Sequence, residues 1–300
     1  MTPSETGRRS LAGVAYASAA YLTWGLFPLY FRALAGVPAP EILAHRIAWS
    51  LLFVAALVTL LRRWEPTLRQ LRAPGTLPRL AASALLISSN WLVYIWAVNS
   101  EHVLQASLGY FINPLVTVLL GVLFQGERLT RRQVLAVAIA AAGVGALVVR
   151  TGQLPWVSLS LAITFGLYGL IRKRVPVDAV AGLLAEVGVL APLALLYLGW
   201  LERSGAAHFL AGPRQTALLA ASGAITAIPL IWFALGVQRL RLTTVGLLLY
   251  LNPTVQFAIA VFAFGEPFTP SHAIAFGCIW ISLAIYTAEA LGAARRGPSS

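Results

Sequence analysis

Ten apolar stretches of about 20 residues divide this chain, and their length constrains the fold more than any motif does. A helix of about 20 residues crosses the hydrocarbon core of a bilayer, which is about 30 Å thick. Because backbone polar groups in lipid must be bonded within the segment, helices are predicted rather than open strands. The composition agrees, since 59% hydrophobic and 11% charged residues leave too little polar surface to coat a soluble globule. The predicted spans are 11–34, 41–61, 80–98, 104–124, 133–149, 154–171, 179–199, 215–235, 244–264 and 272–290.

The basic residues predict how these spans are oriented. Ten spans that start from a cytoplasmic N-terminus place 17 of the 22 Lys and Arg residues in the six segments on the cytoplasmic side. Since cytoplasmic loops collect Lys and Arg, both termini are predicted to be cytoplasmic. The net charge of +12 then reports membrane orientation, and no nucleic-acid partner is predicted, because no basic patch lies on a soluble module.

A repeat divides the chain into two halves. Each copy has an Asn-Pro pair and then a Gly-Glu pair, with 13 positions from proline to glutamate, and a shift of 139 residues superposes them. The copies are Asn113-Pro114 with Gly126-Glu127, and Asn252-Pro253 with Gly265-Glu266. Five spans per unit is an odd number, so the second unit enters the membrane from the opposite side. The predicted organisation is a cytoplasmic tail (1–10), a five-helix repeat (11–150), an inverted five-helix repeat (151–290) and a cytoplasmic tail (291–300).

Inverted repeats predict a function as well as a fold. They recur in secondary transporters, where two halves that exchange conformations open a site near the bilayer midplane to one side and then the other. The alternative that stays open is a duplication that produced a passive bundle or channel. An all-α polytopic membrane protein is predicted in either case.

The two Asn-Pro pairs fall about ten residues into the fourth and ninth spans, near the middle of the bilayer. Proline lacks an N–H and displaces the carbonyl four residues earlier, which for Pro114 is that of Tyr110. Such a carbonyl must be re-bonded by a neighbour or face a wet cavity, and Asn113 and Asn252 are placed for either role. A fixed kink and a hinge beside the solute path, at Pro114 and Pro253, both remain open.

Charged residues within the spans are the strongest candidates for the solute or proton pathway. Glu41, His45 and Arg46 lie near one end of the second span, and Glu186 in the seventh span is the counterpart of Arg46 or His45 in the repeat. Ionisable groups at this depth are rare and usually face the bundle interior or water. Glu186 is interpreted either as an ion-pair partner of Arg46 or as a proton-coupling carboxylate. Glu41 either faces water or belongs to the pathway, and His45 either titrates or is a satisfied buried histidine.

Aromatic residues and Asn90 are candidates for the wall of a solute pocket, with Asn90 as its polar anchor. The alternative is that the rings only pack helices together or form interface belts. The Gly-Glu pairs are expected to be structural, with the glycine ending a helix. The pocket candidates include Asn90, Trp91, Tyr94, Tyr110, Phe165 and Tyr168, and further aromatic residues are Tyr21, Trp24 and Trp232.

Missing motifs exclude several kinds of enzyme. The chain has no phosphate-binding loop of the G-x-x-x-x-G-K-[ST] type and no H-E-x-x-H, and its one lysine, Lys173, lies at the edge of a loop. The single Cys278 lies in an apolar run and is interpreted as packing. No enzymatic activity, cofactor or metal site is predicted.

Several motifs together resemble RarD-type EamA permeases of the drug/metabolite transporter superfamily. They are Tyr21 to Gly25, Val37-Pro38, Glu41 to Arg46, Asn90-Trp91, Trp96 to Asn99, Ala106 to Arg128, Tyr168 to Leu170 and Arg239 to Leu242. The resemblance implies a ten-helix, inverted-repeat permease in the bacterial inner membrane. It also places weight on Glu41, His45, Arg46, Asn90, Asn113, Pro114 and Glu186, whereas the second Asn-Pro pair is looser in the family.

The function predicted is therefore a secondary permease that exports a small organic metabolite or drug by alternating access, with proton coupling through Glu186 as a weaker corollary. The export direction rests on other members of the superfamily, which carry amino acids or metabolites outward. The alternatives are a lipid-carrier flippase and a non-transporting membrane scaffold. The small-residue run 138–146 is expected to pack closely against another helix, in this chain or in a homodimer.

Overall fold

The computed structural model describes residues 3–126, 129–240 and 242–296, and within these ranges the regular structure is entirely helical. Glu127 of the first Gly-Glu pair lies outside the described residues. Each of the ten predicted stretches is helical. Eight form single helices: α3 (Ala39–Leu60), α5 (Thr76–Asn99), α6 (Val103–Gln125), α7 (Arg131–Thr151), α8 (Trp156–Lys173), α9 (Ala179–Ser204), α10 (Pro213–Val237) and α13 (Pro270–Arg296).

The first and ninth stretches are broken helices. The first consists of α1 (Pro3–Gly25) and α2 (Phe27–Arg32), and the ninth of α11 (Leu242–Leu248), α12 (Leu251–Ala258) and the π-helix η1 (Ile259–Ala263). Within the described ranges, seven helices are long and apolar enough to cross a membrane by length and composition: α3, α5, α6, α7, α9, α10 and α13. The chain is thus a multi-pass helical membrane protein. The short helix α4 (Trp64–Leu71) was not predicted.

The two Asn-Pro pairs have different effects on their helices. Helix α6 runs through Pro114 without a break, whereas the ninth stretch breaks at Leu249–Tyr250, just before Pro253. Leu249 carries the carbonyl that Pro253 displaces, and the N–H of Tyr250 bonds three residues back to Leu247 instead of four. A single proline removes only one helix hydrogen bond, and α6 packs closely along α8, which supports a helix that continues past Pro114. The helix is thus interrupted before the second Asn-Pro pair and continuous through the first, and a hinge at Pro114 or Pro253 stays a prediction.

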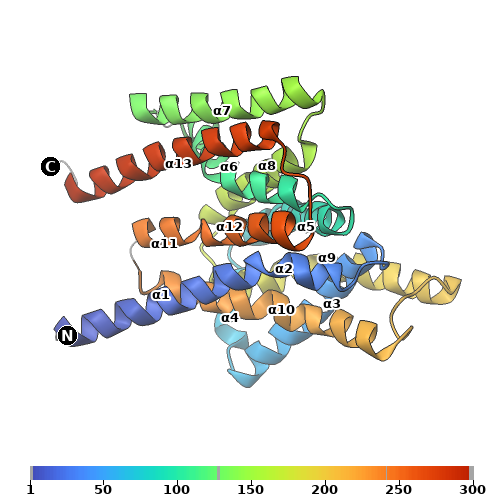
Figure 1. Cartoon of the computed structure of the whole chain (residues 1–300). Coiled ribbons are helices and arrows are strands. Elements are labelled where there is room, and N and C mark those ends of the chain that lie inside the picture. The colour runs from blue at the N-terminus through green and yellow to red at the C-terminus, as the bar shows by residue number, and fades with distance from the viewer. Residues whose placement is uncertain (1–2, 127–128, 241, 297–300) are drawn as a thin grey trace.

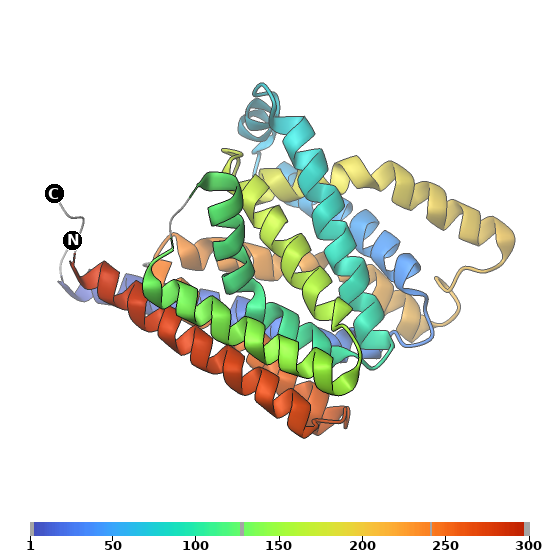
Figure 2. The same ribbon diagram turned by 90° about the horizontal axis from the view of Figure 1, so that it is seen from above.

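The helices pack as a layered bundle in which sequence-distant segments lie side by side (Figure 1). Helix α7 packs along α13 at one edge of the molecule, and α1 packs along α10 and α10 along α3 toward the other edge. Three other close pairs are α6 with α8, α3 with α9, and α5 with α8. The start of α1 and the end of α13 lie at the same end of the bundle in both views (Figure 2).

Close helix contacts depend on small residues. Gly143 of α7 faces Cys278 of α13, where a Cβ on the glycine would lie 2.5 Å from the cysteine Cβ. The hydroxyl of Ser282 donates to the Ala136 carbonyl across the same pair of helices. One face of the small-residue run 138–146 therefore packs within this chain, and the interpretation of Cys278 as a packing residue is confirmed.

Polar contacts between loops join segments that the predicted topology places on the same side. On the side assigned to the cytoplasm, Asp178 lies 3.7 Å from Arg63 and accepts a hydrogen bond from Gln70 at 3.0 Å. On the other side, Arg32 pairs with Glu101 at 2.9 Å. Both contacts join loops that the predicted topology assigns to the same side of the membrane, so they agree with it.

Glu266 connects the loop before α13 to the start of α6. Its carboxylate oxygens accept hydrogen bonds from the backbone N–H groups of Val103 and Leu104, each at 2.7 Å. The first N–H groups of a helix have no partner within the helix, so an acceptor from a distant loop satisfies them. The glycines of the two Gly-Glu pairs have φ of 67° at Gly126 and 68° at Gly265, so the prediction that they end helices is confirmed.

Candidate functional site

Arg46 is buried in the bundle and surrounded mainly by aromatic rings. It lies on α3 with 4% of its surface exposed, and its Nε donates a hydrogen bond to Thr226 Oγ1 of α10 at 2.8 Å. The guanidinium carbon lies 4.0 Å from the centroid of the Trp91 ring on α5, and 5.6 and 5.8 Å from the Phe27 and Phe31 rings on α2. These five residues are the Arg46 cluster, and cation–π contacts hold the charge in it.

The Arg46 charge has no carboxylate partner among the described side chains. Every ion pair found in the described ranges joins other residues, and Glu186 pairs with Arg172. The interpretation of Glu186 as the ion-pair partner of Arg46 is therefore wrong. Arg46 lies near the start of α3 and Glu186 near the start of α9, and Arg172, at the end of α8, is the basic group that reaches Glu186.

Glu186 is the centre of a second polar cluster. Its side chain is almost fully buried on α9, and Oε1 accepts a hydrogen bond from Ser83 Oγ of α5 at 2.7 Å. Arg172 Nε lies 3.6 Å from the same oxygen. The Tyr168 hydroxyl interacts with both charged groups, so the sequence candidates Tyr168 and Glu186 come together. Glu186, Ser83, Arg172 and Tyr168 are the Glu186 cluster.

Gly182 shapes the path of Arg172. A Cβ on Gly182, one helical turn before Glu186 on α9, would lie 2.2 Å from Nη2 of Arg172. The guanidinium therefore rests against the bare backbone of α9 as it reaches toward Glu186. Any larger residue at this position must displace Arg172 from its place.

Asn90 and Tyr110 lie between α5, α6 and α8. Asn90 Nδ2 donates to the Leu161 carbonyl and to Thr164 Oγ1, both at 2.9 Å, and Tyr110 OH approaches Asn90 Oδ1 at 3.5 Å. The polar groups of Asn90 are thus occupied by the protein, which ties α5 to α8. The ring of Tyr94 lies 5.8 Å from that of Tyr110 and continues toward the Arg46 cluster.

Glu41 and His45 lie beneath the loop between α9 and α10. Glu41 is fully buried, and its carboxylate accepts a 2.7 Å hydrogen bond from the backbone N–H of His208 and lies 2.7 Å from His208 Nδ1. The His45 ring stacks on Phe209 at 4.9 Å, and its Nε2 has no hydrogen-bond partner. Of the alternatives for Glu41, exposure to water is wrong, because the loop folds back over the start of α3.

The two repeat asparagines have different neighbours. Asn113 is buried on α6, and its carbonyl accepts a hydrogen bond from Thr117 Oγ1 at 2.9 Å. Asn252 Oδ1 accepts a hydrogen bond from Gln256 Nε2 at 2.7 Å, and the same nitrogen lies 3.4 Å from the Trp24 carbonyl. Trp24 is four residues before Pro28, so Gln256 contacts the carbonyl that Pro28 displaces. Asn252 and Gln256 therefore join the broken ninth stretch to the broken first stretch.

Sequence reasoning missed the partners of the buried charges. Arg172 falls just outside the predicted span 154–171, although its position four residues after Tyr168 places both on one face of α8. Thr226 and Ser83 gave no signal alone. The repeat relates only their spans, the third and the eighth, since a shift of 139 pairs Ser83 with Ser222 and not with Thr226.

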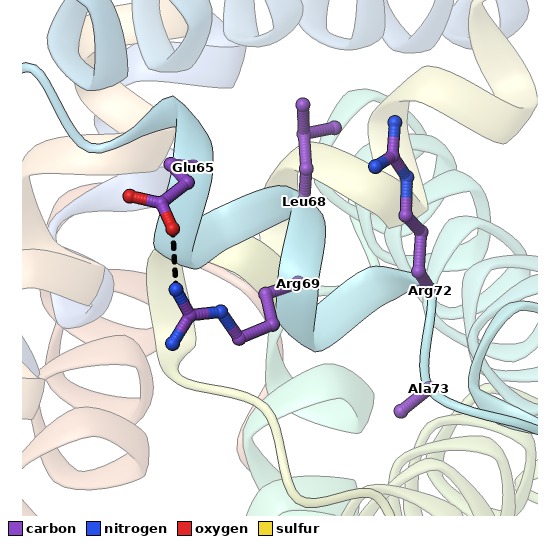
Figure 3. A pocket seen from close by; sticks show the side chains of 5 residues that line it. All are labelled: Glu65, Leu68, Arg69, Arg72 and Ala73. Atoms are coloured by element: carbon purple, nitrogen blue, oxygen red, sulfur yellow. Dashed lines mark hydrogen bonds and ion pairs between the residues drawn. The ribbon is translucent and has the colours of Figure 1, made fainter.

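A hollow of about 380 Å³ lies at the surface beside α4, apart from both clusters (Figure 3). It is lined by Glu65, Leu68, Arg69, Arg72 and Ala73, and Glu65 forms an ion pair with Arg69 there. The side chains of this pair are 81% and 76% exposed. None of the lining residues belongs to either cluster, so the candidate site remains the buried polar interior.

Comparison with known proteins agrees with this architecture. The EamA-like transporter family matches residues 11–149. The chain is 43% identical to an uncharacterized transporter of Vibrio cholerae over 98% of this chain and 97% of the relative. It is 42% identical to protein RarD of Escherichia coli, over 96% and 98% of the two chains, and 46% identical to the uncharacterized transporter YojE of Bacillus subtilis, over 92% and 93%. A crystal structure of a 20% identical protein superposes with a TM-score of 0.58 over 91% of this chain and 96% of the other, which shows a shared fold.

Apolar helices around buried, aromatic-lined charges define a multi-pass helical membrane protein with a polar interior. The alignments with these relatives cover nearly the whole of both chains, and they identify the family. The chain belongs to the EamA-like transporter family, and within that family it is of the RarD type.

Proposed function

We propose that the protein is a secondary permease that exports a small organic metabolite or drug by alternating access of two inverted five-helix halves. The observation that carries the proposal is the pair of buried charged clusters. Arg46 of α3 bonds a hydroxyl on α10, and Glu186 of α9 bonds a hydroxyl on α5. In the repeat, α3 corresponds to α9 and α10 to α5, so the clusters occupy related positions in the two halves.

Two glycine contacts support the inverted repeat. A Cβ on Gly25 would lie 2.7 Å from Val255 Cβ, and a Cβ on Gly166 would lie 3.5 Å from Val116 Cγ1. The repeat pairs Gly25 with Gly166 at an offset of 141 and Val116 with Val255 at 139. In each contact a glycine of one half faces a valine of the other half, and the two contacts are exchanged by the repeat. A two-fold relation between the halves requires this pattern.

The loop contacts support a mechanism in which each side opens in turn. At one end, Glu41 and His208 hold the α9–α10 loop over α3, and at the other end Arg172 and Glu186 join α8 to α9. Alternating access breaks one set of contacts while the other stays closed. In this proposal the protein lies in the bacterial inner membrane, and both termini are cytoplasmic, since the basic segments predict that side for them.

The transport proposal predicts a change in the solutes outside the cell. Spent medium from a host that overproduces the protein is expected to contain a higher level of one or a few small organic solutes than medium from a deletion strain. Purified protein in proteoliposomes should then move the same solute. A solute profile that does not change in either system would contradict a permease and favour a scaffold.

Proton coupling through Glu186 predicts a specific loss. In proteoliposomes, Glu186→Gln is expected to abolish the acceleration of transport by a pH gradient, because an amide cannot take up and release the coupling proton. Exchange of labelled for unlabelled solute should persist. Arg172→Lys is the matched variant, since it keeps the carboxylate and a positive partner, and it should retain the response. An unchanged response in Glu186→Gln would rule the coupling role out.

A further inference from the structure

We infer that Arg46 binds an anionic group of the solute, and that the permease proposed above handles small organic acids with an apolar body. The solute anion would lie between the Arg46 guanidinium and the Tyr94 hydroxyl, against the Trp91 ring. The inference rests on the proposed transport function and adds the charge of the substrate to it.

The first argument is the missing counterion. Arg46 is 4% exposed, and within the described part of the chain it has no carboxylate in ion-pair range. An unpaired charge inside a membrane protein is strongly unfavourable, and such groups pair with one another or mark a substrate pathway. Aromatic faces compensate only part of the charge, because cation–π contacts contribute less than a desolvated ion pair.

The second argument is the unused hydrogen-bonding capacity of the guanidinium. Only Nε donates to a described protein group, the hydroxyl of Thr226. The two Nη groups carry four further N–H donors in a planar fork, and this geometry matches the two oxygens of a carboxylate. The structure thus fixes one edge of the guanidinium and leaves the donors that recognise an anion available.

The third argument is Tyr94. Its side chain is 3% exposed, and its hydroxyl has no hydrogen-bond partner. The Tyr94 ring lies 5.9 Å from the Phe31 ring, which also borders the Arg46 guanidinium. The neighbouring tyrosines are engaged, since Tyr30 donates to the Leu218 carbonyl and Tyr110 approaches Asn90. A buried hydroxyl without a partner, on a ring that packs against the Arg46 cluster, is suited to donate to a bound anion.

The remaining acidic groups of the interior favour acids over amines. Glu186 is matched by Arg172 and Ser83, Glu41 by His208, and Glu266 by two backbone N–H groups at the start of α6. None of these three carboxylates is free to bind a solute cation in this conformation. The Trp91, Phe31 and Tyr94 rings around Arg46 favour an apolar body next to the anion.

Matched pairs of ligands test this inference. Purified protein in nanodiscs is titrated with aromatic and aliphatic carboxylates and with the corresponding neutral amides, for example 3-phenylpropionate and 3-phenylpropanamide, and binding is followed by thermal shift and calorimetry. At least one acid is expected to stabilise the protein while its amide does not. Arg46→Gln should weaken that binding at least tenfold, and Arg46→Lys, which keeps the charge without the fork, should lie between.

Tyr94→Phe is a second test of the inference, which can be used even if Arg46→Gln does not fold. This change removes a hydroxyl that has no protein partner, so folding should be retained, while acid binding should weaken about tenfold, the effect of one hydrogen bond to a charged group. The control is Arg32→Gln, whose arginine is 37% exposed and pairs with Glu101 at the surface. The inference is overturned if no acid binds in preference to its amide, or if Tyr94→Phe binds the acid as the wild type does.

The outcome is separable from the transport proposal. Export of a neutral or cationic solute in the spent-medium experiment would overturn the acid inference and leave the permease in place. Acid binding that depends on Arg46, without flux in proteoliposomes, would retain the site and remove the transport function.

Discussion

Glu266→Ala is expected to lower the free energy of unfolding by about 3 kcal/mol, because it leaves two backbone N–H groups at the start of α6 without an acceptor. Val103 and Leu104 are both buried, and each donates to the Glu266 carboxylate at 2.7 Å. A buried donor that loses its partner retains its full desolvation penalty. Thermal and denaturant unfolding of the detergent-purified protein, followed by tryptophan fluorescence, measures the loss.

Two further variants define what Glu266 contributes. Glu266→Gln keeps one acceptor oxygen and should be less destabilising than the alanine. Glu202→Ala removes an exposed glutamate near the end of α9 and should leave unfolding within about 0.5 kcal/mol of the wild type. A melting curve for Glu266→Ala that coincides with that of Glu202→Ala would show that water or a neighbouring group satisfies these donors.

Gly223→Ala is expected to destabilise the protein by about 2 kcal/mol and to reduce transport, because α10 approaches α3 backbone to backbone at this residue. A Cβ on Gly223 would lie 2.3 Å from the Trp49 carbonyl oxygen and 2.4 Å from its carbon. The backbone of α3 cannot rotate away as a side chain can, so the helices must separate. Thr226 is three residues further along α10, so separation also lengthens its hydrogen bond to Arg46.

A second glycine provides the matched control. Gly145 lies in α7 with no heavy atom within 4 Å of an added Cβ, so Gly145→Ala should be neutral or slightly stabilising through its helix propensity. The melting temperature and the transport rate of the two variants should therefore move apart. Equal melting temperatures for Gly223→Ala and Gly145→Ala would show that the α3–α10 contact adapts.

Local features of the sequence predicted the helices well. All ten apolar stretches are helical, because a segment of this composition in lipid has no other way to satisfy its backbone. Gly126 ends α6 with a positive φ, as its position after the apolar run predicts. The break before α2 was missed, although Pro28 lies in that stretch. Proline alone does not predict a break, because α6 continues through Pro114 whereas the first stretch is interrupted just before Pro28.

For the residues of the candidate site, the sequence predicts burial within the membrane but not the side chains that they contact. The burial of Arg46, Glu186, Asn90 and Trp91 follows from their place within apolar runs. Their partners come from other helices, for example Thr226, 180 residues from Arg46. Pairing at that separation depends on helix rotation and on loop conformation. The loop that brings His208 onto Glu41 has no periodic pattern from which its fold could be derived.

The link between Asn252, Gln256 and the Trp24 carbonyl has a mechanical consequence. It couples the bend in one membrane segment to the bend in another that is more than 200 residues away in the chain. Neither segment can straighten alone without leaving Trp24 or Gln256 with an unmatched polar group in a dry interior. We therefore expect the two bends to move together when the halves exchange conformations.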